Sequence, residues 1–200
     1  MITTCDGATE VDGRSGVLGG PADLARLIGL RAAADVVLVG AGTVRTEHYG
    51  PPSKPGLRIA VVTRSCDLDF GTPLFTSGAG LVVTTLDAPA VPVQSVRAGH
   101  GEIDLAAALG QLEVDLVHVE GGPQLNARLL ADDLVDVIHL TFAPHLTGAR
   151  GRSIAEGAFD PRRFALAEAE VVEGFVFARY ERVRTTRGTG PFPHAVGTRS

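Results

Sequence analysis

Hydrophobic residues occur along the chain in short runs that are separated by glycine, proline and charged residues. A run without polar positions predicts a strand with both faces covered, because alternation is expected only where one face meets water. Segments with apolar residues three or four positions apart predict helices between these runs. We expect strands at residues 35–40, 57–63, 81–85 and 114–119, a weaker strand at 93–96, and helices at 21–31, 41–47, 103–112 and 123–130. This order predicts a single α/β domain with a mainly parallel central sheet and flanking helices.

The two ends of the chain add shorter features. Residues 1–4 predict a short strand, and residues 6–20 a long glycine-rich loop of the kind that often binds ligands. After a strand at 135–143 and an irregular segment, residues 164–172 and 175–183 predict a C-terminal antiparallel hairpin, because only Glu173 and Gly174 join them. Residues 185–200, rich in glycine, proline and threonine, predict a disordered tail behind a domain at 1–184.

The stretch from His118 to Leu130 passes from an apolar strand through Gly121 and Gly122 into a helix that begins at Pro123. Proline suits the first helical position, and the amide groups of such a turn favour an anion, usually a phosphate. An ordinary strand-to-helix connection fits the same residues, and the local sequence leaves both interpretations open.

Three predicted strands end in polar or glycine-rich residues, at 40–43, 63–65 and 120–124. Ligands bind beyond the carboxyl ends of parallel strands, so these segments predict a nucleotide cleft. The pattern Gly40-x-Gly42 lacks the third glycine of a dinucleotide fingerprint, since Arg45 takes its place. Arg64 suits a ribose 2′-phosphate, which separates NADP from NAD, although a solvated arginine at a strand end is the simpler interpretation.

Two carboxylates are candidates for chemistry. Glu120 ends an apolar strand, so it should be partly buried and in need of a partner. Asp6 begins the glycine-rich loop. It either faces a ligand or, as part of an Asp-Gly pair, simply forms a turn.

Composition narrows the function classes. With a net charge of −5 and no basic block beyond a modest C-terminal arginine cluster, nucleic acid is a poor partner. No apolar run reaches the roughly 20 residues of a membrane span, and the N-terminus lacks a signal-peptide pattern, so we expect a cytoplasmic protein without a membrane partner. The two cysteines and six histidines show no metal-ligand spacing.

Several motifs, in order, resemble the pyrimidine reductase domain of riboflavin biosynthesis, which has a dihydrofolate-reductase-like fold. They are Thr4-Cys5-Asp6-Gly7, Val11-Asp12-Gly13-Arg14-Ser15-Gly16, the segment from Leu30 to Val44, and Val119-Glu120-Gly121-Gly122-Pro123 with Leu134-Val135-Asp136. The similarity extends over residues 1–183, and the shared order is more specific than any single motif.

The resemblance implies an NADPH-dependent reductase that converts the ribosyl group of a diamino-ribosylamino-pyrimidinone 5′-phosphate into a ribityl chain. It places NADPH on Thr43, Glu47, Thr63 and the turn from Gly122 to Arg128, and the substrate on Ser15, Arg31 and Glu120. Together with the strand-end argument, the expected cofactor residues are Gly42, Thr43, Glu47, Thr63, Arg64, Gly121, Gly122, Pro123, Gln124 and Leu125. Asp6 and Glu120 are the catalytic candidates, and a homodimer is expected.

Some positions depart from that family. The zinc deaminase signature of its bifunctional members is absent, and Glu47 stands where the biosynthetic enzymes often have aspartate. Lys54 stands where an arginine for the substrate phosphate is expected, and it binds phosphate only as a point charge. Two alternatives therefore stay open: the same fold and cofactor acting on dihydrofolate or another heterocycle, and a non-catalytic NADP-binding module.

Overall fold

The structure, a computed structural model, describes residues 1–148 and 151–184, so the predicted tail lies outside the described residues. A parallel sheet has the strand order β5-β4-β3-β2-β6. Its members are β2 (Val36–Gly40), β3 (Arg58–Val62), β4 (Gly80–Thr84), β5 (Ser95–Arg97) and β6 (Val117–Gly121). These strands confirm the five apolar segments predicted for the parallel sheet, although β5 begins two residues and β6 three residues later than predicted.

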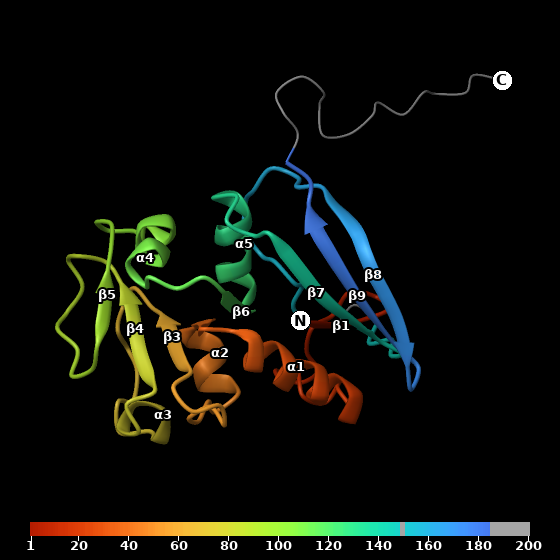
Figure 1. Cartoon of the computed structure of the whole chain (residues 1–200), viewed down its shortest axis with the longest axis horizontal. Helices are drawn as coiled ribbons and strands as arrows, with labels where there is room; N and C mark the ends of the chain where they lie inside the picture. The colour runs from red at the N-terminus through yellow and green to blue at the C-terminus, as the bar shows by residue number, and fades with distance from the viewer. Residues whose placement is uncertain (149–150, 185–200) are drawn as a thin grey trace.

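A second sheet has the order β1-β7-β9-β8 and lies beside the first (Figure 1). It contains β1 (Ile2–Thr4), β7 (Val137–Ala143), β8 (Phe164–Val172) and β9 (Phe175–Arg182). β1 runs parallel to β7, whereas β7, β9 and β8 are antiparallel. Glu173 and Gly174 have φ values of 52° and 82°, so both take the left-handed region of a two-residue hairpin turn. The predicted C-terminal hairpin is confirmed.

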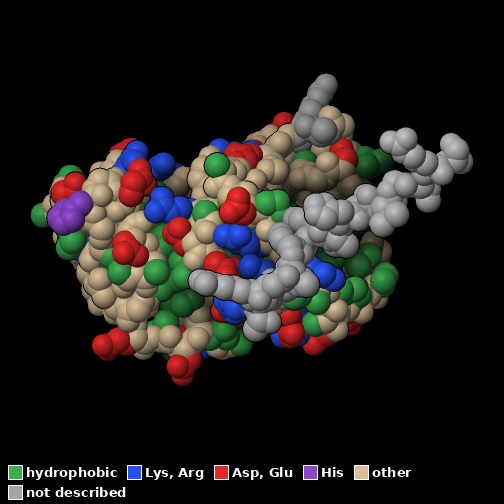
Figure 2. Space-filling view, turned by 90° about the horizontal axis from the view of Figure 1, so that it is seen from above, with side chains coloured by type: hydrophobic (Ala, Val, Ile, Leu, Met, Phe, Trp, Pro, Cys, Tyr) green, Lys and Arg blue, Asp and Glu red, His purple; other side chains and the backbone are tan. Residues whose placement is uncertain are grey.

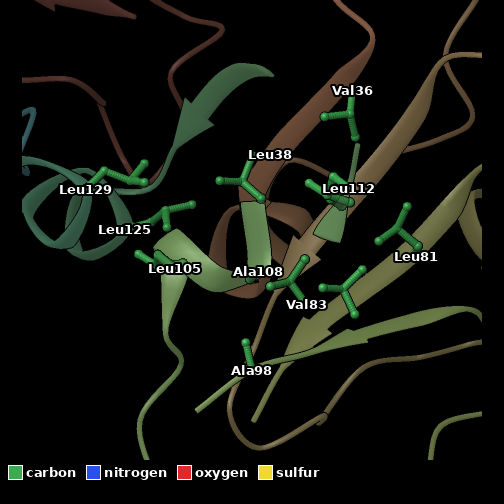
Figure 3. Close-up of a cluster of buried hydrophobic side chains, with 12 residues drawn as sticks. Val36, Leu38, Leu81, Val83, Ala98, Leu105, Ala108, Leu112, Leu125 and Leu129 are labelled. Carbon is green, nitrogen blue, oxygen red and sulfur yellow. The ribbon is translucent and has the colours of Figure 1, made fainter. Parts of the chain in front are cut away.

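Helices cover both faces of the parallel sheet. Val36 and Leu38 point toward α4 (Leu105–Gln111) and α5 (Pro123–Ala131), whose leucines meet them in one core cluster (Figure 3). Val37 and Val39 point the other way, toward α2 (Ala41–Thr46) and the short α3 (Pro73–Thr76), which the sequence pattern did not predict. Because successive strand residues alternate between faces, an unbroken run of valine and leucine fills both clusters.

Helix α1 (Pro21–Ala33) is the exception, because none of its residues is buried. Leu24 and Ile28, which belong to the apolar face of this helix, are 57% and 52% exposed. None of the helices in the described part of the chain has the length and apolarity needed to cross a membrane.

Candidate active site

A cleft lies at the carboxyl ends of β2, β3 and β6. These strands are parallel neighbours, so the three polar segments predicted at strand ends meet at one edge of the sheet. The cleft has a volume of about 360 Å³. Of the predicted cofactor residues it is lined by Gly42, Thr43, Thr63, Arg64, Gly122, Pro123, Gln124 and Leu125. Leu105 and Leu125 belong both to its lining and to the hydrophobic core, so the packed core supports the cleft floor.

Steric constraints require glycine in the turn at the cleft. Gly121 has φ 90°, which favours glycine, and a Cβ on Gly122 would lie 2.8 Å from Thr43 Oγ1. A Cβ on Gly40 would lie 3.3 Å from the Gly122 amide nitrogen. Backbone therefore approaches backbone closely here, and Gly122, the N-cap of α5, makes no side-chain cap hydrogen bond. The first turn of α5 thus offers amide groups and the positive end of the helix dipole to a phosphate of a cofactor.

A second group of polar side chains surrounds Glu120. Arg31 donates two hydrogen bonds of 2.6 Å to its carboxylate, from Nε to Oε1 and from Nη2 to Oε2. The Tyr49 hydroxyl also donates to Oε2, and the Arg31 guanidinium lies 5.6 Å from the centre of the Tyr49 ring. The Glu120 side chain is only 7% exposed. The expectation that Glu120 is buried and has a partner is confirmed, and its partner is another predicted substrate residue.

A β-bulge directs Glu120 toward these partners. Leu38 pairs with Val119, but Val39 pairs with Gly121, so Glu120 is an extra residue in β6. Bulges change the direction of a side chain and are frequent beside active sites. Val119 packs in the cluster formed with α4 and α5, while Glu120 contacts Arg31 of α1 and Tyr49.

The electrostatics of this group fix its protonation. Burial alone raises the pKa of Glu120, but hydrogen bonding and charge from Arg31, with Tyr49 and His118, lower the pKa below its usual value. Burial and the nearby Glu120 raise the pKa of Tyr49, so its hydroxyl stays protonated. At neutral pH the cluster therefore combines a carboxylate, a guanidinium and a neutral phenol, and Glu120 accepts hydrogen bonds.

Sequence reasoning missed Tyr49 and His118. Tyr49 lies in a proline-rich stretch that follows the helix predicted at 41–47, and His118 lies in the strand predicted at 114–119. His118 Nε2 lies 3.5 Å from Glu120 Oε1 and makes no hydrogen bond with the described residues. Burial is the main reason that the pKa of His118 is lowered. The one sequence signal that could have identified His118 was its position two residues before Glu120 in the same strand.

The remaining predicted site residues make contacts that do not involve Glu120. Glu47 accepts hydrogen bonds from Ser15 through the amide at 3.0 Å and the hydroxyl at 2.8 Å, which ties the glycine-rich loop to the end of α2. Lys54 Nζ donates to the Ala34 carbonyl at 2.7 Å, at the end of α1. Asp6 accepts hydrogen bonds from the Thr4 hydroxyl and, at 3.0 Å, from the Thr147 amide. These contacts leave the roles predicted for the four residues untested.

Solved structures resemble this one closely. A pyrimidine reductase-like protein from Corynebacterium diphtheriae is 25% identical, with a TM-score of 0.81 over 92% of this chain and 90% of that chain. A dihydrofolate reductase from Enterococcus faecalis, solved with NADP(H) and RAB-propyl, shares the fold at 15% identity, with a TM-score of 0.57 over 90% and 92% of the two chains. Among sequences, the 2,5-diamino-6-ribosylamino-4(3H)-pyrimidinone 5′-phosphate reductase of Methanothermobacter thermautotrophicus is 27% identical over 175 residues, which cover 78% of each chain.

The fold and its relatives define an oxidoreductase of the dihydrofolate-reductase-like class. Within this class, the model of the RibD C-terminal domain matches residues 1–176. The chain belongs to that family, as the motif order predicted.

Proposed function

We propose that this protein is an NADPH-dependent reductase of riboflavin biosynthesis. Its substrate would be a diamino-ribosylamino-pyrimidinone 5′-phosphate, a phosphorylated heterocycle whose ribosyl group is reduced to ribityl. The observation that carries the proposal is the cleft between Thr43, Thr63 and the Gly122 turn, next to the Arg31–Glu120 pair. The similarity to the Methanothermobacter reductase supports the same substrate class.

The residues of the cleft fit a dinucleotide. A Cβ on Gly122 would collide with Thr43 Oγ1, so glycine lets the turn lie against Thr43 at the cleft, and α5 supplies amide donors. NADPH, when bound, supplies the hydride, while the protein orients the reactants and excludes water. In this proposal Gly122, Gln124 and Leu125 hold cofactor phosphate, and Thr43 and Thr63 contribute hydroxyl groups to the same cleft.

The second part of the proposal concerns the substrate. Arg31 and Glu120 form a fixed pair. In this proposal Glu120 Oε1 accepts a further hydrogen bond, from a ribosyl hydroxyl of the substrate. Because its pKa is lowered, Glu120 is ionised at neutral pH, so we assign it orientation of the substrate and leave proton donation to another group. Asp6 stays a candidate for that proton donor, and Ser15 a candidate for substrate binding beside Glu47.

The position of Lys54 supports a second candidate substrate. Its ammonium contacts the Ala34 carbonyl, whereas the biosynthetic reaction needs a cation for the substrate phosphate. Another heterocycle, such as dihydrofolate, carries no phosphate and would need no cation for one.

Turnover tests these possibilities. Purified protein should consume NADPH when given the ribosylaminopyrimidine phosphate and much less when given dihydrofolate. Turnover of dihydrofolate alone would favour the second substrate. Binding of NADPH without turnover of either compound would favour a non-catalytic module, and in that case Arg31→Ala would leave NADPH binding unchanged. An enzyme that neither binds nor oxidises NADPH would refute the proposal.

A further inference from the structure

The two oxygens of the Glu120 carboxylate are used unequally. Oε2 accepts hydrogen bonds from Arg31 Nη2 and from the Tyr49 hydroxyl, whereas Oε1 accepts one from Arg31 Nε. A carboxylate offers about four acceptor sites, roughly two on each oxygen. Within the described part of the chain, these hydrogen bonds therefore fill Oε2 and leave one acceptor site on Oε1.

His118 lies beside this oxygen without bonding to it. Its Nε2 is 3.5 Å from Glu120 Oε1, is buried and has no hydrogen-bond partner among the described residues. Val119 packs toward α4 and α5, so His118 points to the opposite face of the sheet, and the β-bulge turns Glu120 to that same face. A shift of about half an ångström would bring Nε2 and Oε1 to hydrogen-bond distance.

We propose that His118 is a positioning residue that decides whether Glu120 Oε1 is available to the substrate. This inference rests on the proposed function. Neutral imidazole has one ring nitrogen without a hydrogen, and with that nitrogen at Nε2 His118 has nothing to donate to Oε1. Once a proton from solvent binds there, the imidazolium donates a charge-assisted hydrogen bond to the carboxylate. That bond takes the acceptor site assigned to the ribosyl hydroxyl.

Burial makes this competition effective. On the face seen in Figure 2, acidic and basic side chains lie next to one another at the surface, where water and salt weaken their interactions. Glu120 and His118 are only 7% and 14% exposed. Because water screens buried charges less, a charged His118 should hold Oε1 more firmly than a neutral hydroxyl of the substrate does.

Charged and titratable groups of several elements face His118 and set the pH at which it binds a proton. Burial lowers the pKa of His118 most, and the Met1 amino group, Arg31 of α1 and His139 of β7 lower the pKa further, while Glu120 raises it. The pKa of His118 therefore lies below 6.5, and the ring is neutral at pH 7. Oε1 is available to the substrate at neutral pH and is taken in mild acid.

Steady-state kinetics of the full chain test this, with saturating NADPH and varied ribosylaminopyrimidine phosphate. We expect the KM of the wild type to rise at least about threefold between about pH 8 and about pH 5, because protonated His118 competes with the substrate. The substrate phosphate also titrates, at about pH 6. His118→Leu has no proton to donate, so its KM should show only the rise caused by that phosphate. The pH profile of kcat should be the same in both proteins.

Two further variants sharpen the test. His118→Gln carries an amide N–H that does not titrate, so its KM at about pH 8 should already exceed that of the wild type at least about threefold. His118→Gln also keeps a polar side chain at this position, so it tests the inference even where His118→Leu fails to fold. The matched control is His139→Gln, because burial also lowers the pKa of His139 but this residue lies in β7. It should keep the wild-type dependence of KM on pH.

An equal rise of KM in the wild type and His118→Leu, or a wild-type KM in His118→Gln at about pH 8, would overturn the inference. Failure of the proposed function looks different, because the wild type would then show no turnover at any pH. An NMR titration of the His118 ring needs no substrate. Glu120→Gln should lower the pKa of His118, because the carboxylate raises it, and an unchanged pKa would overturn the contact.

Discussion

Arg31 holds the Glu120 carboxylate with two hydrogen bonds of 2.6 Å, although the residues are 89 positions apart in the chain. The pair joins α1 to β6, and α1 has no buried residue of its own. This contact therefore contributes both to the placement of α1 and to the polar site beside the cleft.

Removal of Arg31 should leave a buried charge without its main partner. We expect Arg31→Gln to lower the free energy of unfolding by about 3 kcal/mol, below the largest values for buried pairs because Arg31 is partly exposed. The double variant Arg31→Gln with Glu120→Gln should recover most of that loss. Urea denaturation of the three proteins measures the coupling, and additive losses would contradict a direct interaction.

Glu120→Gln alone should separate substrate orientation from cofactor binding. The amide keeps the shape of the carboxylate but loses the charge that Arg31 and Tyr49 contact. We expect kcat to fall at least about tenfold while the dissociation constant of NADPH stays within about twofold. Steady-state kinetics and NADPH fluorescence titration measure the two effects. An equal loss of both would place Glu120 in the cofactor site.

Gly122→Val should have the reverse effect. The new side chain would collide with Thr43 Oγ1, which already lies 2.8 Å from a Cβ at this position, and would displace the turn that we propose holds a phosphate. We expect NADPH affinity to fall at least about tenfold. The control is Gly110→Ala in α4, where a Cβ has open space, and it should raise stability by about 0.5 to 1 kcal/mol without changing affinity. Unchanged NADPH affinity in Gly122→Val would remove the turn from the cofactor site.

Stability should decrease as the pH falls below neutrality. Burial is the main reason that the pKa values of His118 and His139 are lowered from 6.5, so both are neutral in the folded state. Below pH 6.5 the unfolded chain binds more protons than the folded chain, and stability declines until the folded histidines also protonate. Urea midpoints at about pH 8 and about pH 5.5 should differ less in His118→Asn than in wild type. A pH dependence in His118→Asn equal to that of wild type would contradict this expectation.

The predicted homodimer has a candidate contact on α1. Leu24, Ala25, Ile28, Gly29 and Ala32 form an exposed apolar stripe along this helix. In a twofold dimer the same patch of each subunit meets, so this stripe would pack against its own copy. We expect Leu24→Lys with Ile28→Lys to halve the mass measured by light scattering, while Leu86→Lys leaves it unchanged. A monomeric wild type would refute the homodimer.

Short-range patterns determined most of the fold. Unbroken apolar runs identified the strands of the parallel sheet, and the two-residue join at Glu173 identified the hairpin, because both features depend on neighbouring residues. The pattern predicted the helix at α1, but its apolar residues Leu24 and Ile28 are exposed. Apolar periodicity predicts that one face of a helix will be covered, but it does not identify what covers that face.

For the site, the sequence by itself determined which strand ends form the cleft, since the carboxyl ends of parallel strands lie at one edge of a sheet. Only the tertiary structure decided that Arg31 and Tyr49 contact Glu120, and that Arg128 joins Arg64 at Glu102. Those contacts join residues far apart in the chain, and the first depends on one extra residue in β6. A bulge of this kind leaves no mark in the hydrophobic pattern, because pairing between strands, and not local sequence, places the extra residue.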